Sequence, residues 1–439
     1  MPVLLRSPRS PLAYPLRLRS SSAAVATAAA AARCSCFLLR SEHRPGSHRL
    51  HAALAVDNRV VMGFGLVTLD YLATVDAYPR PDDKIRTGEL QISGGGNAGN
   101  ALTAAARLGL NTRVISKVAN DETGGTVLSE LMEAGIDTSH VIISDGGNTT
   151  FVYVIIDKQT KTRTRILTPG EPQMVPSDLP MSSLSAALKN VSLLYVDGYP
   201  PEMALVVAKQ ADKMKIPILV DAEQERTKEE LESLLSLASY IVCSEKFPKN
   251  WTSIPSLPCA QLEILLQYPH AKFVIVTLGE KGCMMLERTE AGDGSVAADI
   301  EAVAESLKLQ LHKDGTFPTC VSSKFMRLSA RGLGAIFGRL LIGTAEVIPA
   351  SELVDTTGCG DAFIGAVLQG EELFLFLQQS PFEAPFFVRF CLRNINITLF
   401  PKRIYTIAIT GYITIRNRNF VKQVPKRLSR VRFLYYRSD

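Results

Sequence analysis

The feature that most constrains the fold is a series of short apolar segments that alternate with helical patterns between about residues 60 and 277. Four of these segments are almost continuously apolar: Val191–Asp197, Ile218–Asp221, Tyr240–Cys243 and Phe273–Thr277. Strands that are apolar on both faces and separated by helices are typical of a mostly parallel sheet that is covered on both sides. The alternation therefore predicts an α/β fold.

A second pattern interrupts this series. Thr150–Ile156 and Thr164–Thr168 are rich in β-formers, and the charged linker Asp157–Lys161 joins them, which predicts an antiparallel hairpin. We expect this hairpin, within residues 150–168, to combine with a segment near residues 76–92. Together they would form a small lid sheet beside the main domain.

The charge of the chain is unevenly distributed. The net charge is +5, but residues 1–59 carry +7 and residues 384–439 carry +11, which leaves the globular middle at −13. An acidic middle argues against a nucleic-acid-binding protein. The sequence contains no uninterrupted apolar run of about 18 residues, which argues against a membrane partner.

The N-terminal segment, residues 1–58, has the composition of a transit peptide. Its first 41 residues contain six Arg and no Asp or Glu, and they are rich in Ser and Ala. We expect import into an organelle, a plastid rather than a mitochondrion. The alternative is a low-complexity tail without targeting function, which would leave the protein in the cytoplasm.

The C-terminal segment, residues 370–439, is unlike the rest of the chain. From Ala384 to Ser438 it contains no acidic residue, its apolar residues follow no helical or strand period, and prolines interrupt it. We interpret it as an aberrant tail, produced by a gene-model error or a retained intron. It is expected to pack poorly and to be protease-sensitive after about Gln369.

The strongest chemical motif is Asp355–Phe363, with the sequence DTTGCGDAF. Apolar pairs spaced by four residues predict a helix from about Asp361. Glycines before a helix expose backbone N–H groups at the positive end of its dipole, which suits a phosphoryl group. Asp361 at this position can accept a proton from an attacking hydroxyl. The alternative is an ordinary glycine turn with an N-capping aspartate.

A second motif, Gly94–Ala101, has the sequence GGGNAGNA and also opens a helix. Asn97 and Asn100 lie three residues apart on one helix face, and their amides offer both donors and acceptors to a polyol. The alternative is a loop with an asparagine cap. Neither G-x-G-x-x-G nor a P-loop motif occurs, so dinucleotide-binding and P-loop functions lose support.

The eight cysteines form no C-x-x-C pair, and their spacing fits neither a zinc site nor a disulfide framework. We therefore expect reduced thiols and no metal site built from protein ligands.

Together, the two glycine motifs resemble those of the pfkB carbohydrate kinases, over roughly residues 60–369. Asp70 stands where that family has a sugar-binding carboxylate, and Thr277–Gly282 is similar to its nucleotide loop. The motif at Gly95–Asn100 and the segment Tyr240–Glu245 look closest to ketohexokinase-like members. The resemblance implies a ribokinase-like three-layer sandwich over residues 59–369, with a mostly parallel central sheet and a small β lid.

The resemblance also implies roles for single residues. Asp361 would be the catalytic base, and the amides of Gly358, Cys359 and Gly360 would form an anion hole, with Cys359 replacing the usual alanine. The sugar would be held by Asp70, Gly96, Asn97 and Asn100. ATP would lie against Gly279 and Gly282, with Mg²⁺ bridging its phosphates. Arg163 on the lid hairpin would reach the phosphates or remain a solvated surface charge. A homodimer through the lid is also implied.

Two departures qualify this resemblance. The stretch between Gly282 and Asp355 is several tens of residues longer than in the family, which indicates a surface insertion near residues 290–340. The similarity also stops at about Gln369, before the helices that complete the adenine pocket. The leading hypothesis is an ATP-dependent kinase of a small ketose or pentose-like sugar. The alternatives are a nucleoside kinase and a catalytically inactive scaffold or regulator in an organelle.

Overall fold

The computed structural model describes residues 60–160, 162–289, 297–311, 318–347 and 356–377, with side chains as far as Gly370. The expected transit peptide and the C-terminal tail from residue 378 lie outside the described residues. No helix within the described ranges is long and apolar enough to cross a membrane.

A twelve-stranded sheet forms the centre of the described part of the chain. Seven neighbouring strands are parallel, and their spatial order is β11 (Phe273–Thr277), β10 (Tyr240–Ser244), β9 (Ile218–Ala222), β8 (Val191–Val196), β1 (Val60–Phe64), β4 (Asn111–Ala119) and β5 (Asp137–Ser144). Every residue of β1 and β9 is buried, which explains why these strands carry no polar face. The expected parallel α/β sheet is confirmed.

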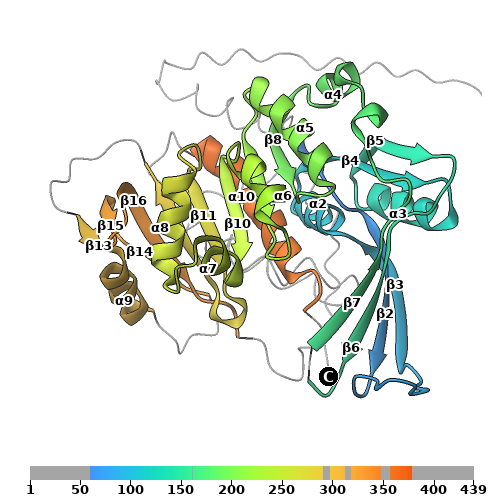
Figure 1. Cartoon of the computed structure of the whole chain (residues 1–439), viewed down its shortest axis with the longest axis horizontal. Coiled ribbons are helices and arrows are strands. Elements are labelled where there is room, and N and C mark those ends of the chain that lie inside the picture. The colour runs from blue at the N-terminus through green and yellow to red at the C-terminus, as the bar shows by residue number, and fades with distance from the viewer. Residues whose placement is uncertain (1–59, 161, 290–296, 312–317, 348–355, 378–439) are drawn as a thin grey trace, which may run out of the picture. The chain divides into compact units, whose positions relative to one another are not determined.

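Helices cover both faces of this sheet (Figure 1). One face packs against α4 (Met181–Ala187), α5 (Pro201–Lys213), α6 (Lys228–Leu235), α7 (Lys246–Thr252), α8 (Leu257–Gln267) and α9 (Ile300–Gln310). The other face packs against α2 (Asn97–Arg107), α3 (Glu122–Glu133) and α10 (Cys359–Leu377). Two short 3₁₀ turns, Pro176–Asp178 and Gly279–Lys281, complete the elements. The result is a three-layer sandwich.

The lid is a separate four-stranded sheet that projects from the sandwich (Figure 1). Its order is β3 (Glu89–Gly95), β2 (Thr68–Val75), β6 (Phe151–Asp157) and β7 (Thr162–Thr168). The hairpin of β6 and β7 is antiparallel, as the sequence predicts. The residue 76–92 segment contributes differently from the expectation, since residues 76–88 connect two strands and only its end belongs to β3.

The long stretch after Gly282, which includes the expected insertion near residues 290–340, contributes several strands to the central sheet. It contains β12 (Cys283–Arg288), β13 (Ala298–Asp299), β14 (Cys320–Ser322), β15 (Met326–Ser329) and β16 (Ala335–Gly343), all in the central sheet. β16 is buried from Gly338 onward and pairs with β12, because an apolar strand of this length requires cover on both faces.

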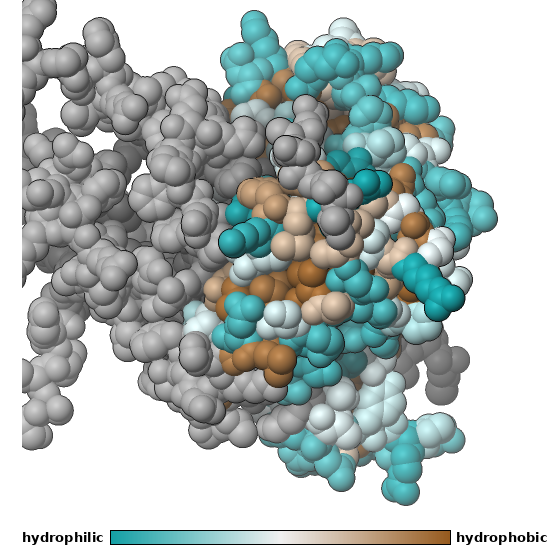
Figure 2. Space-filling model, turned by 90° about the vertical axis from the view of Figure 1, so that its left-hand side faces the viewer, coloured by the Kyte–Doolittle hydropathy of each residue, from teal (hydrophilic) through white to brown (hydrophobic). Residues whose placement is uncertain are grey.

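Figure 2 views the molecule from the side of the sheet edge that β13, β15 and β16 form. Hydrophobic residues on that side are interspersed with hydrophilic ones. Three large apolar side chains of the stretch are exposed: Leu309 of α9 by 88%, Val347 after β16 by 70% and Phe325 before β15 by 45%. The guanidinium of Arg339 lies 4.4 Å from the centre of the Phe325 ring. A cation over an aromatic face reduces the cost of leaving that ring at the surface.

Candidate active site

The two glycine motifs lie at the starts of two neighbouring helices on the same face of the sheet. Asn97 begins α2, and Asp361 lies in the first turn of α10, which starts at Cys359. The two helices pack closely at Gly365, where an added Cβ would lie 2.5 Å from the Cβ of Ala104. This close approach brings together two motifs that are about 260 residues apart in the chain.

The carboxylate of Asp361 and the amide of Asn100 form the centre of the candidate site. Asn100 Nδ2 donates to Asp361 Oδ2 at 2.8 Å. Burial raises the pKa of Asp361 to about 7, and the negative charges of Glu223 and Asp70 add to this effect. The hydrogen bond from Asn100 and the charge of Arg165 act in the opposite direction. A carboxylate with a pKa near neutrality is suited to act as a general base.

Asp70 of β2 is 9% exposed and accepts a hydrogen bond from Thr68 Oγ1 at 2.6 Å. Burial raises the pKa of this carboxyl group. Gly95 packs directly against it, because a Cβ at that position would lie 2.4 Å from the Asp70 carboxyl group. Gly96 has a φ of 84° and lies against the Leu66 carbonyl, so that only glycine fits there. The first motif is thus shaped around Asp70.

Glu223 is a member of the site that the sequence analysis did not include. It follows β9 by one residue, and its Oε1 accepts a hydrogen bond from Asn97 Nδ2 at 2.7 Å. Its other oxygen lies 3.5 Å from Arg226 NH2. The signal that could have identified it is its position, because a polar residue directly after a buried parallel strand lies at the carboxyl edge of the sheet, where ligands bind.

The loop before α10 contains the three residues expected to form the anion hole. Gly358 has a φ of 76°, and Gly360 has open space beside it, since an added Cβ would meet no atom within 4 Å. The amide of Cys359 donates to the Thr356 carbonyl at 3.3 Å. The lid reaches the same loop, because Arg163 NH1 donates to Thr356 Oγ1 at 2.7 Å. Arg163 is therefore placed beside the expected phosphate position.

The expected nucleotide loop follows β11 as a 3₁₀ turn. Gly279 has a φ of 59° with no atom near an added Cβ, which leaves the space above it open. Gly282 has a structural reason to be glycine, since a Cβ there would lie 2.0 Å from the Gly343 carbonyl of β16. Only Gly279 therefore has the open surroundings that a close ligand requires.

Two further carboxylates lie buried at the ends of β8 and β9. Asp197 accepts hydrogen bonds from the backbone amides of Leu66 at 2.7 Å and Tyr199 at 3.0 Å. Burial raises the pKa of Asp197 to about 7 and that of Asp221 well above its usual value. The hydroxyl of Tyr195, which is completely buried, has no hydrogen-bond partner. Burial favours the protonated form of the two carboxyl groups and so reduces the negative charge that they add to the site.

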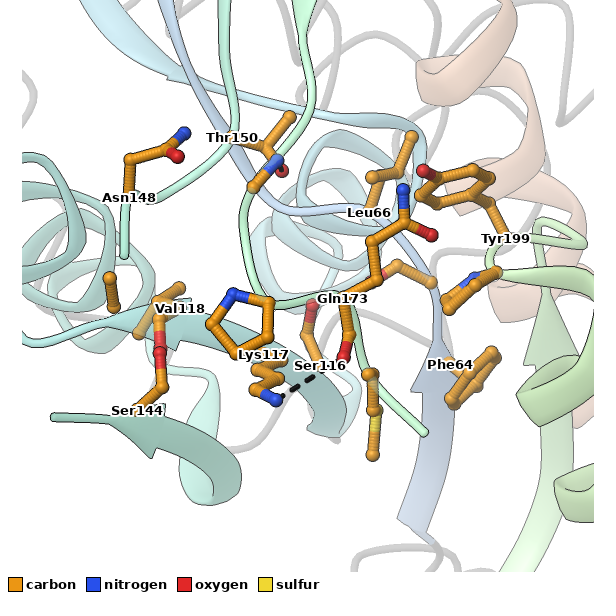
Figure 3. A pocket seen from close by; sticks show the side chains of 16 residues that line it. Phe64, Leu66, Ser116, Lys117, Val118, Ser144, Asn148, Thr150, Gln173 and Tyr199 are labelled. Carbon is orange, nitrogen blue, oxygen red and sulfur yellow. Dashed lines mark hydrogen bonds between the residues drawn. The ribbon is translucent and has the colours of Figure 1, made fainter. Parts of the chain in front are cut away.

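A distinct small pocket lies at the carboxyl ends of β1 and β4 (Figure 3). Leu66, Lys117, Gln173 and Tyr199 are among the residues that line it. The ammonium of Lys117 contacts the Gln173 carbonyl at 3.3 Å and Asp178 at 2.8 Å. The volume of about 40 Å³ suits a few water molecules and is too small for a sugar.

No group of three or more His, Cys, Asp and Glu side chains in the described ranges is arranged to hold a metal ion. The five cysteines within those ranges are free thiols.

A three-layer sandwich of mostly parallel strands, with a four-stranded lid and two glycine loops at helix starts, is the ribokinase-like fold. The ribokinase of Arabidopsis thaliana, whose structure is a complex with ribose and ATP, superposes with a TM-score of 0.52 at 17% identity and covers 77% of this chain and 92% of that one.

Residues 59–303 match the model of the pfkB family of carbohydrate kinases. The chain belongs to that family. The match includes Asp70, the motif at Gly94–Ala101 and the loop at Thr277–Gly282, and it ends before the motif that contains Asp361. The expected role of Asp361 is therefore supported by its own motif and geometry and not by the family match.

Two named enzymes match shorter parts of the chain. An ATP-dependent ribose-1-phosphate kinase from Halopiger xanaduensis is 24% identical over 161 residues, which are 37% of this chain and 53% of the relative. The ketohexokinase of Mus musculus is 23% identical over 202 residues, which are 44% of this chain and 66% of the relative. The chain thus aligns with less than two thirds of the length of either enzyme.

Proposed function

We propose that this protein transfers the γ-phosphoryl group of ATP to a hydroxyl of a small sugar, a ketose or a pentose. The observation that carries the proposal is the position of Asp361. It lies in the first turn of α10 and 2.8 Å from Asn100 of the other glycine motif. A base at this point is next to both a phosphate-binding loop and amides that can hold a polyol.

In this mechanism the sugar is held by Asp70, Asn97 and Asn100, with Gly96 allowing its close approach. Asp361 takes the proton of the attacking hydroxyl as the hydroxyl oxygen bonds to the γ-phosphorus and the bond to ADP breaks. The amides of Gly358 and Gly360 and the positive end of the α10 dipole stabilise the charge on the transferred group. Arg163, held at Thr356, adds a positive charge from the lid.

ATP would lie along the loop at Gly279, where the backbone conformation and the open space fit a close ligand. Because the described residues contain no cluster of metal-ligating side chains, Mg²⁺ would arrive with the nucleotide phosphates and keep most of its water ligands. Its contribution when bound is to neutralise phosphate charge. The hydrogen bond between Asn100 and Asp361 keeps the candidate base beside the candidate sugar-binding amides. This arrangement favours a kinase over the alternative of an inactive scaffold.

The test is ADP release with a panel of ketoses, pentoses and nucleosides. We expect turnover with at least one sugar, and Asp361→Asn should lower kcat by about 10²–10⁴-fold because it removes the base. Asp145→Asn, at an exposed turn, is the matched control and should retain full activity. A nucleoside as the best substrate would favour the nucleoside kinase. No turnover with any compound, or full activity of the Asp361 variant, would refute the proposal.

We also propose a homodimer through the outer face of the lid. Ile92, Tyr71, Tyr153 and Ile166 stand directly opposite one another across the four strands and so lie on one face. The side chains of Ile92, Tyr153 and Ile166 are 50%, 50% and 51% exposed. A continuous apolar row on an exposed sheet is typical of an interaction surface, and an isologous pair of lids would cover it.

A further inference from the structure

Two asparagines on one face of α2 are held by two different carboxylates. Asn100 donates to Asp361 at 2.8 Å, and Asn97 donates to Glu223 at 2.7 Å. An amide whose nitrogen is committed to a carboxylate has a fixed orientation, and its oxygen remains as an acceptor. Glu223 therefore fixes the orientation of the Asn97 amide, as Asp361 fixes that of Asn100.

We propose that Glu223 is a positioning and specificity residue of the sugar site, and this inference rests on the proposed function. Glu223 fixes the amide of Asn97 so that its oxygen accepts from a sugar hydroxyl. Its negative charge at the edge of the site also selects neutral sugars against those that carry a phosphate or carboxylate group. Neither role follows from the sequence motifs, because Glu223 belongs to neither of them.

The charge of Glu223 is only partly neutralised. Its nearest cation is Arg226, at 3.5 Å, which is longer than a charge-assisted hydrogen bond. The guanidinium of Arg226 is shared with the ring of Tyr199, 5.1 Å away, and its Nε atom is buried without a hydrogen-bond partner. An arginine in this state is the competing candidate, because an anionic substrate group would satisfy that N–H. The charges around it decide between the two.

Those charges are mainly negative. Glu223 acts electrostatically on three other carboxylates, Asp361, Asp197 and Asp221. The groups that face Asp361 come from every neighbouring element: Asn100 of α2, Asp70 of β2, Arg165 of β7, Tyr195 of β8, Asp221 of β9, and Glu223 after β9. Asn100 and Tyr195 carry no charge, and burial favours the protonated form of Asp221. Two acids, Asp70 and Glu223, thus stand against one cation, Arg165, so a second anion entering with the substrate would meet net repulsion in a site of low dielectric.

Two substitutions separate the proposed roles. Glu223→Gln keeps an oxygen that can accept from Asn97 and removes the charge. Glu223→Asp keeps the charge and shortens the side chain by one methylene, so that it no longer reaches Asn97. Glu225→Gln is the matched control, because Glu225 lies in the same loop, is exposed, and contacts Gln224 rather than the site.

Binding is measured by calorimetry without nucleotide, with D-ribose and D-fructose as neutral probes and ribose 5-phosphate as the anionic probe. The wild type should bind the better neutral sugar at least tenfold more tightly than the phosphate. Glu223→Gln should reduce that preference about tenfold, as expected for one charge in a partly buried site. Glu223→Asp should weaken the neutral sugar by roughly tenfold, as expected for a lost buried hydrogen bond, and Glu225→Gln should match the wild type.

Kinetics provide the readouts that a merely structural residue would not move. In Glu223→Asp the loss should appear in KM, with kcat little changed. In Glu223→Gln the acid limb of the kcat/KM profile should move to lower pH, because one negative neighbour of Asp361 is removed. Tighter binding of ribose 5-phosphate than of either neutral sugar by the wild type would overturn the proposal and favour Arg226 as an anion-binding residue.

The two failures can be told apart. If no sugar is phosphorylated but the neutral probes bind with the expected preference, the proposed function fails and the inference about Glu223 stands. If turnover is found but Glu223→Gln retains the full preference for neutral sugars, the inference fails and the kinase remains.

Discussion

At the scale of single residues, the site is built by pairing amides with carboxylates. Asn97 and Asn100 are three residues apart on α2, and each donates to one acid from a distant part of the chain. The sequence analysis identified both asparagines, Asp70 and Asp361 from their motifs, and the structure brings Asn100 and Asp361 into contact. Glu223 belongs to no motif, and its only signal in the sequence is its position directly after the buried strand β9.

The position of Asp361 predicts the pH dependence of activity. A general base must be deprotonated, and burial raises the pKa of Asp361 to about 7. We therefore expect kcat/KM to fall about tenfold per pH unit below pH 7 and to level off above it. Initial rates from pH 5 to 9 at saturating ATP measure this. A profile that stays level down to pH 5 would show that another group is the base.

The same shift has the opposite effect on stability. Asp361 and Asp197 both have a folded pKa of about 7, above the ordinary value of 3.8. Between these values the folded state binds more protons than the unfolded chain, so the free energy of unfolding decreases as pH rises from about 4 to 7. For the fully buried Asp197 the slope is of order 1.4 kcal/mol per pH unit. Denaturant unfolding at pH 5 and pH 7.5 tests it, and equal stabilities would contradict it.

At the scale of elements, periodicity predicted most of what the structure contains. The helix predicted to open at the motif Gly94–Ala101 is α2, which spans Asn97–Arg107, and the predicted hairpin is formed by β6 and β7. These segments have local signals, an alanine-rich helical face and two β-rich runs around a charged turn. The strands of the stretch after Gly282 are not predicted by the sequence, because sheet membership of β16 depends on its partner β12, which no local pattern encodes.

The packing of α2 against α10 gives a prediction at this scale. A Cβ at Gly365 would lie 2.5 Å from Ala104 Cβ and 2.7 Å from the Ala101 carbonyl. Gly365→Ala must therefore push the helices apart, and overpacking of this kind costs about 1–3 kcal/mol. We expect a lower Tm and a lower kcat, since the same helices hold Asn100 and Asp361.

The control for this substitution is Gly125→Ala in α3, where an added Cβ would meet no atom within 4 Å. It should be neutral or raise the free energy of unfolding by up to about 1 kcal/mol, because alanine is the better helix former. If Gly365→Ala behaved like Gly125→Ala, the close approach of the two helices would not hold the site together.

At the scale of the whole molecule, the two faces of the lid carry different kinds of side chain. Asp70, Arg163 and Arg165 lie on the face that contains Leu72 and Val154, because directly paired and alternate residues share a side of the sheet. That face reaches the catalytic loop through Arg163 and Thr356. The opposite face carries the apolar row at Ile92, Tyr153 and Ile166. In the proposed function one face of the lid contributes to the site, and the other is the face proposed for assembly.

The oligomeric state tests the proposed use of that outer face. A stable interface of ordinary size buries about 800 Å² per partner, and charge at its apolar centre is strongly unfavourable. We expect the full chain to be a dimer by light scattering at micromolar concentration, and Ile166→Lys, in edge strand β7, to shift it to monomer with its circular dichroism unchanged. Met132→Lys on α3, where the side chain is 56% exposed, is the matched control and should remain dimeric. A monomeric wild type, or an Ile166→Lys variant that stays dimeric, would show that copies of this chain do not pair through the lid.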